Sequence, residues 1–257
     1  WNHCGDINLA KKFIKAAKDN GADYAKFQTW STSRLKKGSW DDDGRREIYE
    51  KAELSIEDHI ELIEYCKECN ISFLSSVFSI QDAELLVELG CDIVKIPSFE
   101  SRNKDLIKFC NEKFKTIIMS GGTSTFDEIK ESVKLIDKAD LYLMHCVSVY
   151  PGEYSEANIP KMKRLATLCN KIGLSDHIEG VESSKVAIGE GAVIIEKHFT
   201  IDKTLPGRDN KFSILPDQLK NLAYFIKNRN LMLTDQGSGF NIKENDSRLN
   251  YTGRFDG

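Results

Sequence analysis

The chain has 257 residues, of which 40% are hydrophobic and 30% charged, and its net charge is −4. This mixture buries a sizeable core behind a solvated surface, which excludes intrinsic disorder. Acidic and basic residues are interleaved without a basic block, so we expect no nucleic-acid partner. The sequence shows no signal peptide and no run of 18 apolar residues, so we expect a cytoplasmic protein without a membrane partner.

The seven cysteines are typical of a reducing compartment. Their number is odd and they are scattered, whereas a secreted disulfide framework is denser and usually even. Cys66 and Cys69 form a Cys-x-x-Cys pair inside an amphipathic helical pattern, and no second pair accompanies it. We therefore expect free thiols and no structural zinc site.

Short apolar runs alternate along the chain with longer stretches of 3.6-residue periodicity. The periodic stretches predict helices at Ile7–Asn20, Ile56–Cys69, Gln81–Leu89, Asn103–Cys110, Thr125–Asp137, Asn158–Cys169, Val181–Gly189 and Pro216–Arg229. The apolar runs predict buried strands at Ala22–Trp30, Ile71–Phe78, Ile93–Ser98, Thr116–Gly122, Leu141–Ser148, Lys171–His177 and Val193–Thr200.

Alternating strands and helices indicate right-handed βαβ units and a parallel sheet. One strand before the first helix would complete eight units, so we predict an α/β fold, a TIM (β/α)8 barrel whose first strand is missing or truncated in this chain. The barrel is expected at residues 1–230 and an extended C-terminal tail at 231–257. An open doubly wound sheet is the alternative, but no Gly-x-Gly-x-x-Gly follows the first strand. The polar segment Ser31–Leu54 is predicted to be a long loop on the active-site face.

Polar side chains end every predicted strand. Because the strand ends of a TIM barrel share one face, we expect these side chains to share one pocket. They are Lys26, Gln28, Ser75, Ser76, Lys95, Ser98, Glu100, Ser120, His145, Ser148, Tyr150, Ser175, Asp176, His177, Glu196, Lys197 and His198.

Two of these side chains, Lys26 and Lys95, indicate what the pocket binds. Two lysines are buried together only beside a strongly anionic ligand or a paired carboxylate. Ser98, Ser120 and the glycines that follow Ser120 add hydroxyls and accessible backbone N–H groups that suit phosphate or carboxylate oxygens. The middle strands therefore predict a site for a small phosphorylated anion.

His177 and His198 end adjacent strands. Two imidazoles that lie close together can share a divalent metal, whose remaining positions go to water, substrate or a carboxylate. A hydrogen-bonded pair without metal is the alternative.

Several motifs in order along the chain resemble one family. They are Asn2-His3 with Gly5, Gly21–Thr29, Phe73–Phe78, Lys95–Glu100, His145–Pro151, Gly173–His177, Glu196–Thr200 and Pro206–Asp209. In these segments the chain resembles the sialic acid synthase family, the N-acetylneuraminate synthases and their nonulosonic-acid relatives. The resemblance implies a TIM barrel that condenses phosphoenolpyruvate with an N-acylated amino-sugar aldose, similar to N-acetylmannosamine, into a 3-deoxy-nonulosonic acid, releasing phosphate.

The resemblance also implies roles for individual residues. Phosphoenolpyruvate would be held by Lys26, Lys95, Ser98, Ser120 and Ser175, with Ser76 near the phosphate. His177 and His198 would bind Mn²⁺ or Mg²⁺. The sugar would face Gln28, Ser148, Tyr150 and Asp209, with Glu100 lining the same pocket. We expect Lys26, Lys95, Glu100 and Asp209 to be the catalytic residues, and the family implies a homodimer.

The chain also departs from the family pattern. The family's glutamate before the Asn-His motif is absent because the chain starts at Trp1, and nothing after Arg229 resembles the antifreeze-like C-terminal domain of many bacterial members. Ser148 stands where asparagine is frequent, Gly121 where threonine is frequent, and Phe99 where glycine is usual. Two other functions stay open: an aldolase with Lys95 or Lys26 as Schiff-base nucleophile, and a degenerate, non-catalytic barrel that binds sugar phosphates.

Overall fold

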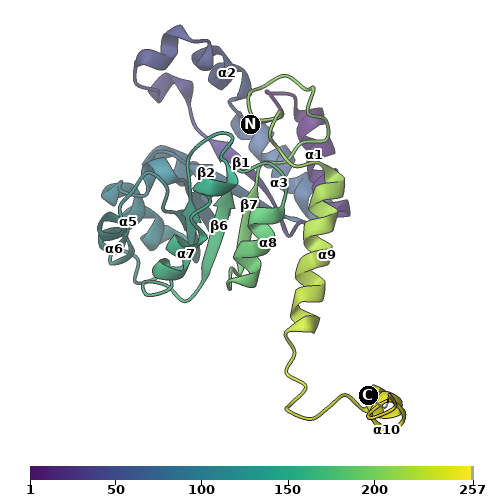
Figure 1. The fold of residues 1–257 in the computed structure, drawn as a ribbon. Helices are drawn as coiled ribbons and strands as arrows, with labels where there is room; N and C mark the ends of the chain where they lie inside the picture. Colours follow the sequence, from purple (N-terminus) through teal and green to yellow (C-terminus); the bar gives the residue numbers. More distant parts are fainter. Residues whose placement is uncertain (256–257) are drawn as a thin grey trace.

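The computed structural model describes residues 1–255, apart from the side chains of residues 39 and 40, and its strands form one parallel sheet. The strands are β1 (Tyr24–Thr29), β2 (Ser72–Val77), β3 (Ile93–Ile96), β4 (Thr116–Ser120), β5 (Asp140–Cys146), β6 (Ile172–Asp176) and β7 (Ile194–Lys197). They lie side by side in chain order, with helices packed outside the sheet (Figure 1). The predicted β/α-barrel fold is confirmed, and within residues 1–255 the sheet ends at β1 and β7.

The helices follow the predicted sequence of elements. The α-helices are α1 (Ile7–Asp19), α2 (Arg45–Ala52), α3 (Ile56–Glu68), α4 (Ile80–Glu88), α5 (Lys104–Lys113), α6 (Phe126–Val133), α7 (Ile159–Leu165), α8 (Glu182–Gly189), α9 (Pro216–Met232) and α10 (Asn245–Asn250). The short 3-10 helices are η1 (Thr32–Arg34), η2 (Ser39–Asp42), η3 (Ser98–Glu100), η4 (Tyr154–Glu156) and η5 (Ile242–Glu244). No helix within residues 1–255 is long and apolar enough to cross a membrane.

Two helices are shorter than the periodicity predicts. The segment after α6 continues in tighter turns, in which the amides of Leu135 and Ile136 bond carbonyls three residues earlier. After α7, the amides of Thr167 and Leu168 do the same. The apolar side chains keep a nearly helical spacing through such turns. The periodicity therefore predicts ends of α6 and α7 that lie later in the sequence than the observed ends.

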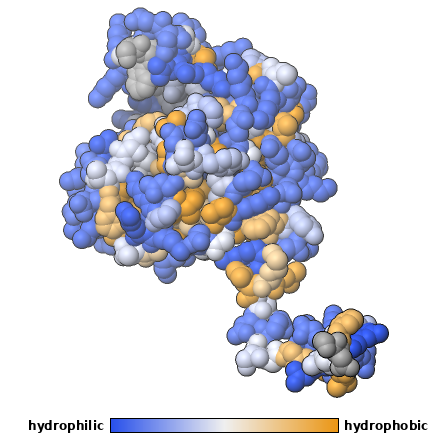
Figure 2. All heavy atoms as spheres, viewed as in Figure 1, coloured by the Kyte–Doolittle hydropathy of each residue, from blue (hydrophilic) through white to orange (hydrophobic). Residues whose placement is uncertain are grey.

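Two segments predicted without helices contain them. The loop after β1 folds into η1, η2 and α2, which stand above the barrel on the side of the strand C-termini (Figure 1). The tail from residue 231 is not uniformly extended, because it contains η5 and α10, and it lies away from the barrel (Figure 1 and Figure 2). Residues 256–257 lie outside the described residues. Side-chain caps explain η5, since Asn241 accepts a hydrogen bond from the amide of Lys243.

The main apolar core lies between the sheet and the outer helices, and a smaller one lies inside the barrel. The inner one consists of Leu74 on β2, Ile118 on β4 and Met144 on β5, with the partly buried Tyr142 and Ile194 against them. We call Leu74, Ile118 and Met144 the apolar floor. It closes the barrel interior below the strand C-termini, as a packed layer does in a TIM barrel.

Replacing Leu74 with Ala is expected to lower the free energy of unfolding by about 2–5 kcal/mol, because the floor cannot collapse into the cavity that is left. Val186→Ala is the matched control, since Val186 is 55% exposed on α8 and should change stability by less than about 0.5 kcal/mol. Urea unfolding of both variants measures the difference. Equal stability of the two would show that the floor is not packed.

Candidate active site

The strands alternate between a face toward the barrel interior and a face toward the outer helices. On β1, Ala25 and Phe27 belong to the core under α1 and α3, so Lys26 and Gln28 point the opposite way, into the barrel. The register carries this interior face around the sheet: Gln28 pairs with Ser76, Ser76 with Lys95, and Ser175 with Glu196. Polar side chains from five strands therefore meet above the apolar floor.

Glu196 is the centre of this polar layer. Its carboxylate lies 2.7 Å from Nζ of Lys95 and 3.3 Å from Nζ of Lys26. Ser175 Oγ donates to Glu196 Oε1 at 2.8 Å, and Lys26 Nζ lies 3.5 Å from Ser76 Oγ. Although burial alone would raise the pKa of Glu196, Lys26 and Lys95 hold it well below its usual range. The carboxylate is ionised, and the two lysines have the partner that their burial requires.

The ends of β3 and β4 form a pocket of hydroxyls and backbone amides beside this layer. The amide of Gly122 donates to Ser98 Oγ at 3.1 Å. A Cβ at Gly122 would lie 2.6 Å from both Ser98 Oγ and Ser148 Oγ, so a side chain there would displace these two hydroxyls. Ser120 Oγ is buried and has no hydrogen-bond partner among the described residues. An unpaired buried hydroxyl is costly, and Ser120 Oγ keeps its hydrogen-bonding capacity unused at the end of β4.

His177 and His198 face each other at the end of β6 and β7, with ring centroids 5.2 Å apart. Nδ1 of His177 lies 3.0 Å from the carbonyl of Val147, and Nδ1 of His198 lies 3.2 Å from Oδ2 of Asp209. Burial, aided by the neighbouring His177, holds the pKa of His198 well below its ordinary value, so this ring is neutral. Because each Nδ1 faces an oxygen acceptor, a neutral ring carries its proton on Nδ1. The free lone pair of such a ring is then on Nε2.

This arrangement fits a divalent metal. Metal-binding histidines usually donate their second ring N–H to a carboxylate or a carbonyl, and both partners are present here. Within residues 1–255, no group of three or more His, Cys, Asp or Glu side chains is arranged to hold a metal ion. An ion on the two imidazoles would take its other ligands from water and substrate, as catalytic sites with open positions do.

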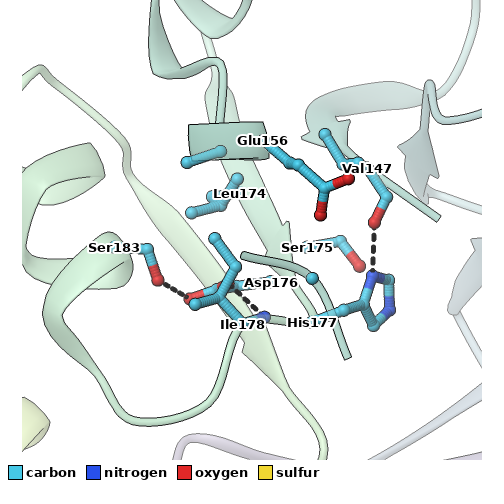
Figure 3. A pocket seen from close by; sticks show the side chains of 10 residues that line it. Val147, Glu156, Leu174, Ser175, Asp176, His177, Ile178 and Ser183 are labelled. Atoms are coloured by element: carbon cyan, nitrogen blue, oxygen red, sulfur yellow. Dashed lines mark hydrogen bonds between the residues drawn. The ribbon is translucent and has the colours of Figure 1, made fainter. Parts of the chain in front are cut away.

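A small cavity lies beside His177, between the segments that follow β5 and β6. It is lined by Val147, Gly152, Glu156, Ala157, Leu174, Ser175, Asp176, His177, Ile178 and Ser183. Figure 3 shows His177 turned toward the Val147 carbonyl and Asp176 turned the other way, toward Ser183. Asp176, the last residue of β6, thus supports the strand from outside, while His177, the next residue, faces the site.

Four of the polar residues that end the strands point toward the outer helices, and not into the shared pocket as the sequence predicts. Ser75 bonds Thr29 beneath α3, and His145 lies 2.8 Å from the carbonyl of Ala157. Lys197 pairs with Asp176 at 3.2 Å, and both are almost completely buried. The side-chain period of two explains this correction, because every second residue of a strand faces the helices.

Asp176 holds the segment that carries His177. One of its oxygens accepts from Ser183 Oγ at 2.7 Å and from Ser184 Oγ at 2.6 Å, both on α8. The other accepts from the amide of Ile178 at 3.0 Å. The start of α8 and the loop after β6 are thereby tied to one buried carboxylate, which fixes the backbone on both sides of His177.

Cys146 was not among the predicted site residues, although it points into the site from the end of β5. Its Sγ lies 3.8 Å from Nδ1 of His177 and 3.6 Å from Ser148 Oγ. Burial raises the pKa of the thiol, but the contact with His177 lowers it to about 7. Cys146 is an interior group that the predicted pocket omitted, whereas Glu196 was predicted in the pocket without a role. The sheet register places both side chains on the interior face, because Cys146 pairs with Ser175 and Ser175 pairs with Glu196.

Two of the predicted sugar-facing residues, Tyr150 and Asp209, lie on the side of the histidines. The ring centroid of Tyr150 is 4.2 Å from that of His177, and Asp209 contacts His198. Gln28 points into the barrel from β1. Glu100 is engaged elsewhere: its carboxylate accepts from Nδ2 of Asn103, which caps α5, at 2.7 Å. Of the two predicted acids, Asp209 is thus the one in contact with a candidate metal ligand.

The chain is similar to known proteins in both sequence and fold. The model of the NeuB family matches residues 13–238. The chain is 38% identical to the N,N'-diacetyllegionaminic acid synthase of Campylobacter jejuni, covering 88% of the chain and 73% of that protein. It is 36% identical to the pseudaminic acid synthase of Helicobacter pylori, covering 96% and 77%. The crystal structure of an N-acetylneuraminic acid synthetase from Leptospira borgpetersenii superposes with a TM-score of 0.87 at 30% identity, covering 98% of the chain and 89% of that structure.

Replacing Glu196 with Gln is expected to lower the free energy of unfolding by about 3–5 kcal/mol, because Lys95 stays buried without its carboxylate. The variant should also lose part of the acid sensitivity of the protein. The folded-state pKa of Glu196 is depressed, so its stabilisation is complete above its unfolded pKa of about 4.3 and is lost as the pH falls below it. Denaturant unfolding at neutral pH and at about pH 3 measures both effects.

The double variant Lys95→Met/Glu196→Gln is the control for this substitution. It removes both members of the closest ion pair and should be more stable than Glu196→Gln alone. If Glu196→Gln unfolds with the free energy of the unsubstituted protein at neutral pH, Glu196 is not the charge partner of Lys95.

Proposed function

The chain belongs to the NeuB family, and from this premise we propose that it condenses phosphoenolpyruvate with an N-acylated amino-sugar aldose. The products are a 3-deoxy-nonulosonic acid and inorganic phosphate. The names of its relatives support this class, because they are synthases of legionaminic, pseudaminic and N-acetylneuraminic acids. One observation carries the proposal. Two lysines and a buried free hydroxyl, which suit an anion, lie at the same barrel mouth as two facing imidazoles.

The lysine side of the site is proposed to bind phosphoenolpyruvate. Lys26 and Lys95 share the single carboxylate of Glu196, so this cluster keeps one positive charge for an anionic substrate. Oxygens of the phosphate and carboxylate would accept hydrogen bonds from Ser120 and from the hydroxyls of Ser76, Ser98 and Ser175. Glu196 keeps the lysines charged and in place while the anion enters and leaves.

The histidine side is proposed to hold a divalent cation, Mn²⁺ or Mg²⁺, through Nε2 of His177 and His198. When bound, the ion supplies Lewis-acid polarisation of the sugar aldehyde. The acceptors at Nδ1, Val147 and Asp209, would keep both rings turned toward it.

The reaction then needs correct positioning more than covalent help from the protein. C3 of phosphoenolpyruvate bonds to the aldehyde carbon, the aldehyde oxygen takes a proton, and positive charge develops at C2. Water adds at C2 and loses a proton. The C2–O bond to phosphate then breaks as the new C2 hydroxyl becomes the ketone of the product, and the proton of that hydroxyl goes to the leaving phosphate. Lys26 and Lys95 balance the charge of the phosphate as it leaves. Asp209 is proposed to move the proton at the aldehyde oxygen, because it lies against His198 whereas Glu100 is bound to Asn103.

The residues proposed to select the sugar lie at the rim. Tyr150 packs against His177, and Ser148 lies beside Cys146. Gln28 points into the barrel from β1, and Phe99 beside Ser98 is 58% exposed. Tyr150 is 43% exposed, so both rings offer apolar surface to a sugar that carries acyl or methyl groups. We therefore propose that these side chains, rather than the lysine side, distinguish one N-acylated sugar from another.

Phosphate release is expected only when phosphoenolpyruvate, a divalent metal and an N-acylated amino sugar are present together. Lys95→Met should reduce kcat/KM at least about a hundredfold, because the charge next to the bound anion is lost. Lys171→Met is the matched control, since Lys171 pairs with Asp140 at the protein surface, and it should keep full activity. No release from any of a panel of such sugars would disprove the synthase function.

Two further measurements test the alternative functions, the Schiff-base aldolase and the non-catalytic barrel. A Schiff-base aldolase would be trapped by borohydride as a covalent adduct on Lys95 or Lys26, whereas the proposed reaction forms no imine. A non-catalytic barrel would bind phosphoenolpyruvate in calorimetry and release no phosphate.

His198→Ala is expected to abolish metal-dependent turnover and to weaken Mn²⁺ binding, because one of two protein ligands is removed. Mn²⁺ titration followed by electron paramagnetic resonance measures the binding without turnover. His59→Gln serves as control, since His59 is a buried histidine bonded to Thr29 on the outer face of β1. Unchanged metal-dependent activity in His198→Ala would refute the ligand assignment.

A further inference from the structure

The carboxylate of Asp209 has two partners at one oxygen. Nε1 of Trp1 donates to Asp209 Oδ2 at 2.5 Å, and Nδ1 of His198 lies 3.2 Å from the same oxygen. Asp209 is only 9% exposed, so these contacts lie largely away from solvent. The indole, the carboxylate and the imidazole thus form a continuous chain that ends at the candidate metal site.

The backbone of Asp209 is fixed independently of this chain. Its carbonyl accepts from Ser213 Oγ at 2.6 Å and from the amide of Ser213 at 3.1 Å. What remains to be fixed is the rotation of the side chain about its own bonds. A carboxylate that accepts from a single imidazole can still turn away, whereas a second donor on the same oxygen restricts it.

The indole of Trp1 is itself held by an aromatic cluster, which consists of Trp1, Trp30, Tyr49 and Phe78. The ring centroid of Trp1 lies 5.0 Å from that of Tyr49 on α2 and 6.1 Å from that of Trp30. Trp30 contacts Tyr49 and Phe78 and donates its own N–H to the carbonyl of Tyr49 at 3.3 Å. The segment after β1, including α2, therefore packs against the group that contacts Asp209.

We propose that Trp1 is a positioning residue for the condensation reaction: its indole N–H holds the Asp209 carboxylate on Nδ1 of His198. This contact keeps Nε2 of His198 aimed at the metal and keeps Asp209 beside the reacting sugar. The aromatic cluster fixes the indole, so α2 supports the histidine side of the site through Trp1. The catalytic part of this inference rests on the proposed function, and the geometric part does not.

Packing alone is the competing explanation, because a tryptophan in an aromatic cluster stabilises a fold whatever its N–H does. The cluster provides a matched control. Trp1→Phe and Trp30→Phe each remove one indole N–H and keep an aromatic ring in the same cluster. Only the N–H of Trp1 is bonded to the site, since that of Trp30 is bonded to the backbone of Tyr49.

The first measurement uses the full chain without metal, labelled with ¹⁵N-histidine. The imidazole signals of His198 are identified by their loss in His198→Ala. In Trp1→Phe the Nδ1–H signal of His198 is expected to shift or to exchange away, because its acceptor is free to turn. In Trp30→Phe it is expected to stay in place. If Trp1→Phe does not fold, as judged by its thermal melt, Trp1→Leu repeats the measurement.

The second measurement uses the metal-loaded protein. In Trp1→Phe, kcat and Mn²⁺ affinity are each expected to fall about tenfold, at the lower end of the effects of outer-shell metal partners. The KM for phosphoenolpyruvate should stay unchanged, since Lys26 and Lys95 form their ion pairs with Glu196 and not with Asp209. Trp30→Phe should leave all three values within about twofold of the unsubstituted protein.

Two results would overturn the positioning role. One is an unchanged His198 signal in folded Trp1→Phe or Trp1→Leu, and the other is the same loss in Trp30→Phe. Failure of the proposed function is recognised separately, because the unsubstituted protein would then release no phosphate while the imidazole spectrum still decides the role of Trp1.

Discussion

The site depends on the burial of one charged group, the ammonium of Lys95. This side chain is 1% exposed and extends from the middle of a parallel sheet. An isolated buried charge costs so much free energy that the fold must supply an opposite charge, and Glu196 supplies it across the barrel. Because Lys26 shares the same carboxylate, the fold accepts one excess positive charge in its interior. The excess charge lowers the stability of the folded protein, but it suits an anionic ligand. This use accounts for the polar residues in the layer directly above the apolar floor.

The alternation of side chains lets each strand serve two purposes at once. On β6 and β7, Ser175 and Glu196 face the interior, while their neighbours Asp176 and Lys197 form a buried pair with α8 on the outside. The outer pair anchors the backbone that sets the positions of the inner groups, including His177 at the next position. A substitution on the outer face thus acts on the site by moving the strand rather than by changing the chemistry.

Much of this could be predicted from the sequence, and the limits have physical causes. The barrel followed from seven apolar runs alternating with helical periodicity, and the need for a carboxylate near the lysines followed from the cost of burying charge. Glu196 was not chosen as that carboxylate, because its position opposite Lys95 depends on how the sheet curls. Ser75 and His145 end their strands and were therefore predicted in the shared pocket, but the side-chain period of two turns them toward the outer helices. The contact between Trp1 and Asp209 joins residues at opposite ends of the barrel sequence, and no local pattern indicates it.

The unpaired groups of the site suggest how binding and stability are linked. Ser120 is buried without a partner, and the lysine cluster carries an excess charge, so both raise the free energy of the folded protein. An anion that satisfies them binds only the folded state and therefore stabilises it by mass action. The histidine side differs, because the Nδ1 atoms of both rings already have oxygen partners and the rings are oriented before any ion arrives. The two sides of the site thus differ: the lysine side has unsatisfied charge and hydroxyl groups, and the histidine side has a fixed geometry.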